Sequence, residues 1–91
     1  MRRVLLVTYT LRNETKDYTP LFTAIKNNGS KWWHYIDMAW IVQTTLTADQ
    51  FAHKLYPFIE KSDQLLVVQV TREHQGWLPM KAWEWFKTLT Y

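Results

Sequence analysis

Four short runs of β-branched and aromatic residues divide this chain and limit the folds open to it. They are Val4–Tyr9, Lys31–Ile36, Met38–Thr44 and Asp63–Val70. The first and the last are apolar on both faces, which is typical of strands buried within a sheet. The second and third are close enough to form a hairpin that turns at Asp37. The chain therefore predicts a four-stranded sheet.

A first helical segment lies between the first two runs. It begins with Asp17 or Thr19 as its cap, has Pro20 in its first turn and ends at residues 27–29. Its apolar residues recur at helical spacing and are Tyr18, Leu21, Phe22 and Ile25.

A second helical segment starts at a capping-box signature, with Thr47 as the cap and Gln50 three residues later. Pro57 bends this helix or ends its regular part, because proline has no N–H to donate within a helix. Its inner face consists of Phe51, Leu55, Phe58 and Ile59. A third, short helix opens at Pro79 and carries Trp83, Trp85, Phe86 and Leu89.

The order of these elements predicts an α+β fold of the ferredoxin-like type. A βαββαβ order gives an antiparallel sheet of four strands with two helices on one face, and here a short C-terminal helix is added. The right-handed crossover rule gives the strand order 4-1-3-2, with Val4–Tyr9 and Met38–Thr44 in the centre. Because 91 residues leave no room for a second core, we expect a single domain over residues 1–91.

The chain contains no cysteine, which excludes disulfide frameworks, zinc knuckles and thiol catalysis. A secreted domain of this size usually needs such cross-links, so we expect a cytoplasmic protein. The apolar run that begins at Val4 ends at Thr8 and is soon followed by Arg12, which makes it too short for an export signal or a membrane span. The glycine patterns that bind nucleotide phosphates are missing, and no cofactor is expected.

The net charge of +3 permits contacts with the phosphates of nucleic acid without requiring them. The residues that we predict to make backbone contacts are Arg12, Lys16, Lys31 and Arg72. The first two lie in the polar loop after the first strand, where Asn13 can assist them. An ordinary solvated loop is the alternative interpretation.

Residues 31–35 read Lys-Trp-Trp-His-Tyr. On a strand, Trp32 and His34 share one face while Trp33 and Tyr35 share the other. One of these faces can stack on bases or contact a partner protein, and the sequence leaves both alternatives open. His34 is the candidate for acid–base catalysis because imidazole titrates near neutrality, although no nucleophile or carboxylate pair accompanies it and a structural role is favoured. The histidines are too scattered to predict a metal site.

The C-terminal segment contains three tryptophans close together, Trp77, Trp83 and Trp85. One short helix cannot bury Trp83 and Trp85 fully. We therefore predict that the three form a homodimer interface, where aromatic side chains concentrate. Packing of the helix over the sheet is the alternative.

Several segments resemble the small bacterial and phage proteins labelled SinR-like. They are Leu5–Tyr9, the helix containing Asp17, Tyr18 and Leu21, residues 32–35 (Trp-Trp-His-Tyr), Trp40–Val42, Asp63–Val67 and residues 75–79 (Gln-Gly-Trp-Leu-Pro), and they extend along nearly the whole chain. More distantly, the layout is similar to CRISPR-associated protein two and to the VapD toxins. This resemblance implies a ferredoxin-like homodimer and, in some members, metal-dependent cleavage of RNA or DNA.

In that group the catalytic carboxylate is an Asp directly after the tyrosine of the first strand, and here this position is Thr10. A neutral hydroxyl cannot replace the anionic oxygen that Mg²⁺ prefers. Asp37, in the predicted hairpin turn, would have to reach across to the same place. The substitution therefore argues against nuclease activity, and no metal site is expected.

Three hypotheses for function follow. The first is a non-catalytic homodimer that binds the nucleic-acid backbone without reading sequence. The second is a protein-interaction module of a phage or toxin–antitoxin system that engages a host or cognate protein. The third is a residual metal-dependent endonuclease that uses His34 or a carboxylate not identified from the sequence.

Overall fold

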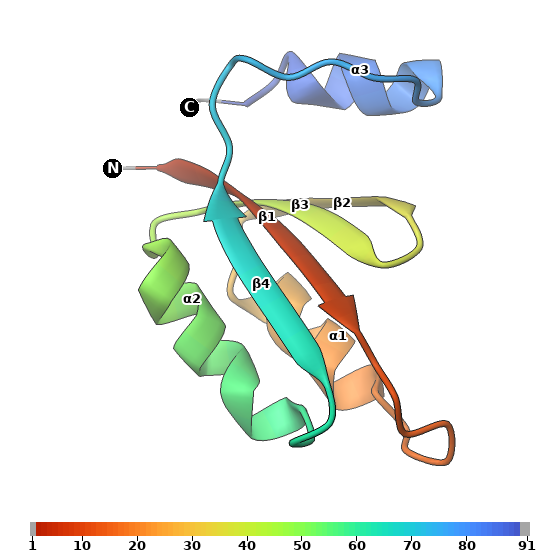
Figure 1. Ribbon diagram of the computed structural model, residues 1–91. Helices are drawn as coiled ribbons and strands as arrows, with labels where there is room; N and C mark the ends of the chain where they lie inside the picture. Colours follow the sequence, from red (N-terminus) through yellow and green to blue (C-terminus); the bar gives the residue numbers. More distant parts are fainter. Residues whose placement is uncertain (1, 90–91) are drawn as a thin grey trace.

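The computed structural model describes residues 2–89 of the chain. Its elements follow the order β1, α1, β2, β3, α2, β4 and α3, with a 3₁₀ turn, η1, directly after α2 (Figure 1). Their bounds are β1 Arg3–Thr10, α1 Thr19–Asn27, β2 Lys31–Ile36, β3 Ala39–Thr44, α2 Ala48–Leu55, η1 Tyr56–Phe58, β4 Gln64–Gln69 and α3 Met80–Phe86. The predicted α+β class is therefore confirmed.

The strands form one four-stranded antiparallel sheet in the order β2-β3-β1-β4. Read from the other edge this order is 4-1-3-2, so β1 and β3 are the central strands. Val7 of β1 lies opposite Trp40 of β3 and opposite Val67 of β4. All three side chains belong to the same core or pack against it.

β4 is an edge strand, as the order 4-1-3-2 predicts, but it is not buried on both faces as its apolar run indicates. Leu65 and Val67 pack against the core, but Leu66 is 57% exposed and Val68 is 42% exposed on the other face. The prediction was wrong because an unbroken apolar run does not reveal whether both faces of a strand are covered.

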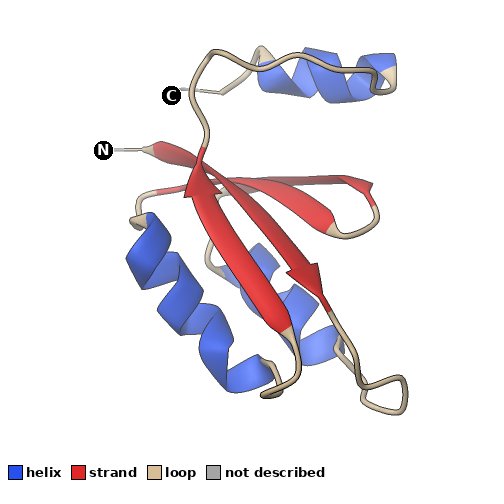
Figure 2. Cartoon of the chain, in the orientation of Figure 1, coloured by secondary structure: helices blue, strands red, loops and turns tan. Residues whose placement is uncertain are grey.

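Helices α1 and α2 pack on one face of the sheet, and α3 lies across the other face (Figure 1, Figure 2). The core beneath α1 and α2 is the larger, and its fully buried side chains include Leu5, Val7, Leu21, Ile25, Val42, Phe51 and Leu55. The smaller core beneath α3 consists of Val4, Trp33, Ile41, Ala82, Phe86 and Leu89. The C-terminal helix therefore makes a third layer over the sheet.

The helix ends follow the local sequence. Thr47 and Gln50 form the predicted capping box, each side chain accepting from the other residue's backbone N–H at 3.1 and 3.0 Å. α2 ends just before the 3₁₀ turn that contains Pro57. The cap of α1 is Tyr18, not Asp17 or Thr19, although Asp17 Oδ1 accepts from the backbone N–H of Thr19 at 3.0 Å. Within residues 2–89, none of the helices is long and apolar enough to cross a membrane.

Candidate functional site

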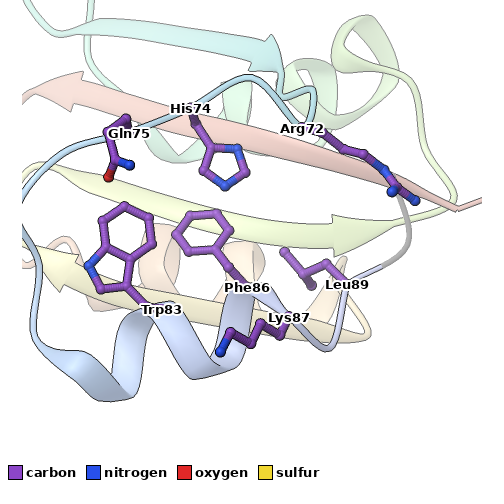
Figure 3. A pocket seen from close by; sticks show the side chains of 7 residues that line it. All are labelled: Arg72, His74, Gln75, Trp83, Phe86, Lys87 and Leu89. Carbon is purple, nitrogen blue, oxygen red and sulfur yellow. The ribbon is translucent and has the colours of Figure 1, made fainter.

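A groove lies between the loop that follows β4 and helix α3 (Figure 3). Its volume is about 670 Å³. It is lined by Arg72, His74 and Gln75 from the loop and by Trp83, Phe86, Lys87 and Leu89 from α3 and the residues just after it. We call this groove, as defined by these side chains, the basic groove.

The loop side of the basic groove is shaped by hydrogen bonds close to β4. The backbone N–H of Val70 donates to the carbonyl of Val4 at 2.7 Å, which extends the pairing with β1 beyond the last residue of β4. The backbone N–H of His74 donates to the carbonyl of Arg72 at 3.1 Å, and its ring Nδ1 lies 2.9 Å from the carbonyl of Thr71. Because a carbonyl oxygen only accepts, Nδ1 carries a hydrogen and Nε2 is the acceptor when the ring is neutral.

Three aromatic rings form one wall of the groove. The centroid of the His74 ring is 4.6 Å from that of Phe86 and 6.3 Å from that of Trp83, whose plane is only 7° from the His74 plane. Phe86 is buried, whereas His74 and Trp83 are half-buried and keep part of their ring surface accessible. Flat ring surfaces at the edge of a groove suit stacking with another planar group.

Both side chains with a permanent charge that line the basic groove are cationic. They are Arg72 on the loop and Lys87 just after α3, and among the lining residues that the structure describes none is Asp or Glu. Lys31 lies at the same end of the sheet, since its Nζ is 3.4 Å from the carbonyl oxygen of Thr88. The groove therefore presents a local excess of positive charge to a ligand.

The four cations predicted from the sequence lie at two ends of the sheet. Lys31 and Arg72 are at the end where β1 begins, because Lys31 opens β2 and Arg72 follows β4. Arg12 and Lys16 are at the other end, because they follow the last residue of β1. The structure thus places two of the four predicted cations at each end of the sheet.

At the second end, the cations lie among acidic side chains. Arg12 lines a hollow with Asn13, Glu60, Lys61 and Ser62. Lys16 Nζ donates to the carbonyl of Phe58 at 3.2 Å and lies 4.0 Å from Glu60 Oε1, so its charge has a partner within the chain. This hollow differs from the basic groove in having an acidic side chain, Glu60, among its described lining residues.

Asp63 holds the loop that carries Arg12. Its carboxylate accepts from the backbone N–H groups of Arg12 and Glu60, each at 2.8 Å, and from the hydroxyl of Tyr18. Burial alone would raise the pKa of Asp63, but these hydrogen bonds outweigh burial and hold the pKa below its ordinary value. The ionised carboxylate is therefore an anchor for the loop.

The three tryptophans predicted for a dimer interface have different surroundings. Trp83 lines the basic groove, and Trp85 packs edge-on against Phe86 with the ring centroids 6.1 Å apart. Both are half-buried against the core beneath α3. This packing of the helix over the sheet is the alternative to a dimer interface that the sequence left open. Trp77, in the loop before α3, is 99% exposed.

His34 has a structural environment. Its ring lies on the indole of Trp40, with centroids 4.0 Å apart and planes 6° apart, and its Nδ1 is 2.9 Å from the carbonyl of Ala39. Thr10 is the exposed last residue of β1, and Asp37 is exposed in the turn between β2 and β3. Across residues 2–89, no three histidine or acidic side chains come together as a possible metal site.

Lys87 and His74 were not predicted as site residues. Lys87 could have been found, because Trp83 and Lys87 are four residues apart and therefore share one face of a helix. The position of His74 could not, because an irregular loop gives no periodicity from which its direction can be predicted.

No protein-family model, no curated protein and no solved structure matches this chain. The resemblance to the SinR-like proteins therefore stays a prediction that rests on the sequence motifs at residues 32–35 and 75–79. The role of the basic groove is accordingly inferred from its own chemistry.

Proposed function

We propose that this chain is a non-catalytic protein that binds the backbone of nucleic acid through the basic groove. The observation that supports this most is the convergence of Arg72 and Lys87 on one groove, whose lining residues within 2–89 include no Asp or Glu. Phosphates attract such a pair through charge, and a guanidinium also forms paired hydrogen bonds with phosphate oxygens. Lys31, beside the end of α3, extends the cationic surface along the sheet.

The aromatic wall supports binding that does not depend on sequence. Trp83 and His74 offer ring surface beside the two cations, and every base has a flat face that can stack on a ring. Gln75 contributes an amide that can donate to phosphate or sugar oxygens. We therefore expect single strands to bind at least as well as duplexes.

We also infer that the fold is of the ferredoxin-like type, that the protein acts as a homodimer and that its location is cytoplasmic. The alternation of two helices with four strands, and their order in the sheet, support the first inference. The exposed indole of Trp77 supports the second, because tryptophan is enriched at the centre of interfaces. The lack of cysteine supports the third.

The proposed function is tested by fluorescence anisotropy with labelled single-stranded RNA, single-stranded DNA and duplex DNA. Each is titrated at about 50 and about 200 mM salt, with and without Mg²⁺. We expect binding that weakens at the higher salt concentration and leaves the strands intact. Absence of binding at low salt would contradict the proposal. Cleavage that requires Mg²⁺ and is lost in His34→Ala would instead favour the endonuclease.

A protein-interaction module is the second candidate, and one observation favours it. Trp77 is 99% exposed and Met80, close to it in sequence, is 76% exposed, so two large apolar side chains project from the start of the C-terminal segment. A pull-down with the whole protein would then recover one partner in stoichiometric amount. That recovery would resist nuclease treatment and be lost in Trp77→Ser.

A further inference from the structure

Three buried polar atoms within the described residues have no hydrogen-bond partner. They are Oε1 and Nε2 of Gln43, whose side chain is 1% exposed, and Nε1 of Trp33, which is 3% exposed. The backbone carbonyl of Gln43, in contrast, accepts from the backbone N–H of Ser30 at 2.8 Å. Buried polar groups are nearly always paired, so an amide and an indole left without partners in one place need a reason.

Both side chains lie on the sheet face that α3 covers. Gln43 stands opposite Lys31 of β2 and opposite Val4 of β1, and Trp33 belongs to the core beneath α3. The rings of Trp33 and Phe86 have their centroids 5.8 Å apart. Since alternate residues of a strand share a face, a cation, an indole and an amide form one patch beneath the helix.

Few interactions of its own stabilise helix α3 over this patch. It has seven residues, its cap Pro79 makes no side-chain hydrogen bond, and its first turn contains no acidic residue and its last turn no basic residue. A helix of this length has little stability of its own in water. It is held by the burial of Ala82, Phe86 and Leu89 and by the hydrogen bond from Lys31 Nζ to the carbonyl of Thr88 just after it. The amide of Gln43 and the indole of Trp33 stay unsatisfied on the same face of the sheet.

We infer that Gln43, Trp33 and Lys31 form a second binding site, which takes an unpaired base of single-stranded nucleic acid. Helix α3 is a displaceable cover over this site. The inference rests on the proposed function for its class of ligand. When α3 moves aside, the buried polar atoms gain partners that the closed form denies them. The strand would bind first in the basic groove, and because the same helix lines that groove, the groove opens together with the cover.

The chemistry of the patch fits a base better than it fits a phosphate alone. The amide of Gln43 offers a donor and an acceptor side by side, the arrangement that pairs with the edge of a base. The indole of Trp33 offers a flat surface for stacking, and Tyr35 lies next to it with ring centroids 5.2 Å apart. Lys31 supplies the charge for the adjoining phosphate. Duplex DNA keeps its bases stacked and paired and cannot enter in this way.

The test compares wild type with Gln43→Met, which keeps the length of the side chain and removes both unpartnered atoms. We expect Gln43→Met to raise the melting temperature by about 4 °C, because the closed form loses an unsatisfied group. We also expect its affinity for single-stranded DNA to fall roughly tenfold while its affinity for duplex DNA is unchanged. Trp33→Phe replaces the indole by a smaller ring without the N–H, and it should likewise lower the affinity for single-stranded DNA. Gln69→Met, at an exposed position of β4, is the matched control and should alter neither quantity.

Hydrogen exchange gives the second readout on the same proteins. The backbone amides of α3 in the free wild-type protein should exchange faster than those of α1 and α2, and single-stranded DNA should accelerate them further. Full single-strand affinity in Gln43→Met, or unchanged exchange in α3 on binding, would overturn the inference even if the basic groove binds nucleic acid. If wild type bound neither strand type, the proposed function would fail first and this site with it. In that case slow exchange in free α3 would separately contradict the displaceable cover.

Discussion

The hydroxyl of Tyr18 donates to both carboxylate oxygens of Asp63, at 2.9 and 2.8 Å. The bond joins the cap of α1 to the residue just before β4 and so ties the segment between β1 and α1 to the start of β4. Burial raises the pKa of Tyr18, and the neighbouring charge of Asp63 raises it further, so the phenol stays protonated and keeps donating. The pair is an element of stability at the end of the sheet away from the basic groove.

Replacing Asp63 with asparagine should destabilise the protein by about 2 kcal/mol, because one of two oxygens that accept hydrogen bonds becomes an amide that donates. The backbone N–H of Arg12 or of Glu60 would then face a donor. The measurement is urea unfolding followed by tryptophan fluorescence. Asp49→Asn, in the exposed first turn of α2, serves as the control and should cost much less. Equal losses in the two variants would contradict the anchoring role of Asp63.

The same carboxylate predicts how stability depends on pH. Because the pKa of Asp63 is lower in the folded protein than in the unfolded chain, the unfolded chain binds the proton more readily. The stabilising contribution is therefore complete above the ordinary pKa of aspartate and is lost as the pH falls through the folded value. We expect the free energy of unfolding of wild type to fall between about pH 5 and about pH 2, with a shallower slope in Asp63→Asn. Asp17, whose pKa is also lowered by hydrogen bonds from Thr19, leaves a residual slope in the variant.

Gly29 is required by the close approach of the chain to β3. A methyl group at this position would overlap Cγ1 of Val42, a fully buried and β-branched side chain that has little freedom to move. Gly29→Ala should therefore lower the free energy of unfolding by about 2 kcal/mol, the usual cost of forcing extra volume into a packed core. Gly76→Ala is the matched control, because nothing lies near the position of its added methyl group. A change at Gly76 as large as that at Gly29 would exclude overpacking as the cause.

The sequence predicts the strands, the capping box and the central position of β1 and β3 because these depend on local pattern and on a general rule of chain connection. Pro57 likewise ends α2 through its own geometry. The exposed face of β4 could not be predicted, since Leu66 and Val68 look like core residues until the position of α3 is known. The side of the sheet on which α3 packs is decided by tertiary contacts of Phe86 and Leu89.

The candidate site is less predictable than the fold. Arg72 and Lys31 were selected for their charge, and both lie at one end of the sheet. Arg12 and Lys16 lie at the other end of the sheet because their loop follows the last residue of β1. The charge of a residue does not reveal at which end of the sheet it lies. The lack of a hydrogen-bond partner for the amide of Gln43 could not be predicted, because a glutamine after an apolar run usually marks the exposed end of a strand.

The exposure of Trp77 predicts what its replacement does to stability. Trp77→Ser should leave the free energy of unfolding within about 0.5 kcal/mol of wild type, because the side chain is 99% exposed. It should convert a homodimer to a monomer if Trp77 anchors the interface, as measured by light scattering after size exclusion. Trp85→Ser, at a half-buried residue, is the comparison and should lower stability instead. A Trp77→Ser protein that remains a dimer would remove this residue from the interface.

The most direct test of nucleic-acid binding through the basic groove compares two double variants that remove the same charge. Arg72→Gln with Lys87→Gln removes the two cations that line the groove, and Arg12→Gln with Lys61→Gln removes the two cations that line the hollow at the other end. For single-stranded DNA, the account predicts that only the groove variant weakens binding and that its slope of log affinity against log salt is shallower by about 1.4. An equal loss in both variants, or a loss confined to the Arg12 and Lys61 variant, would contradict it.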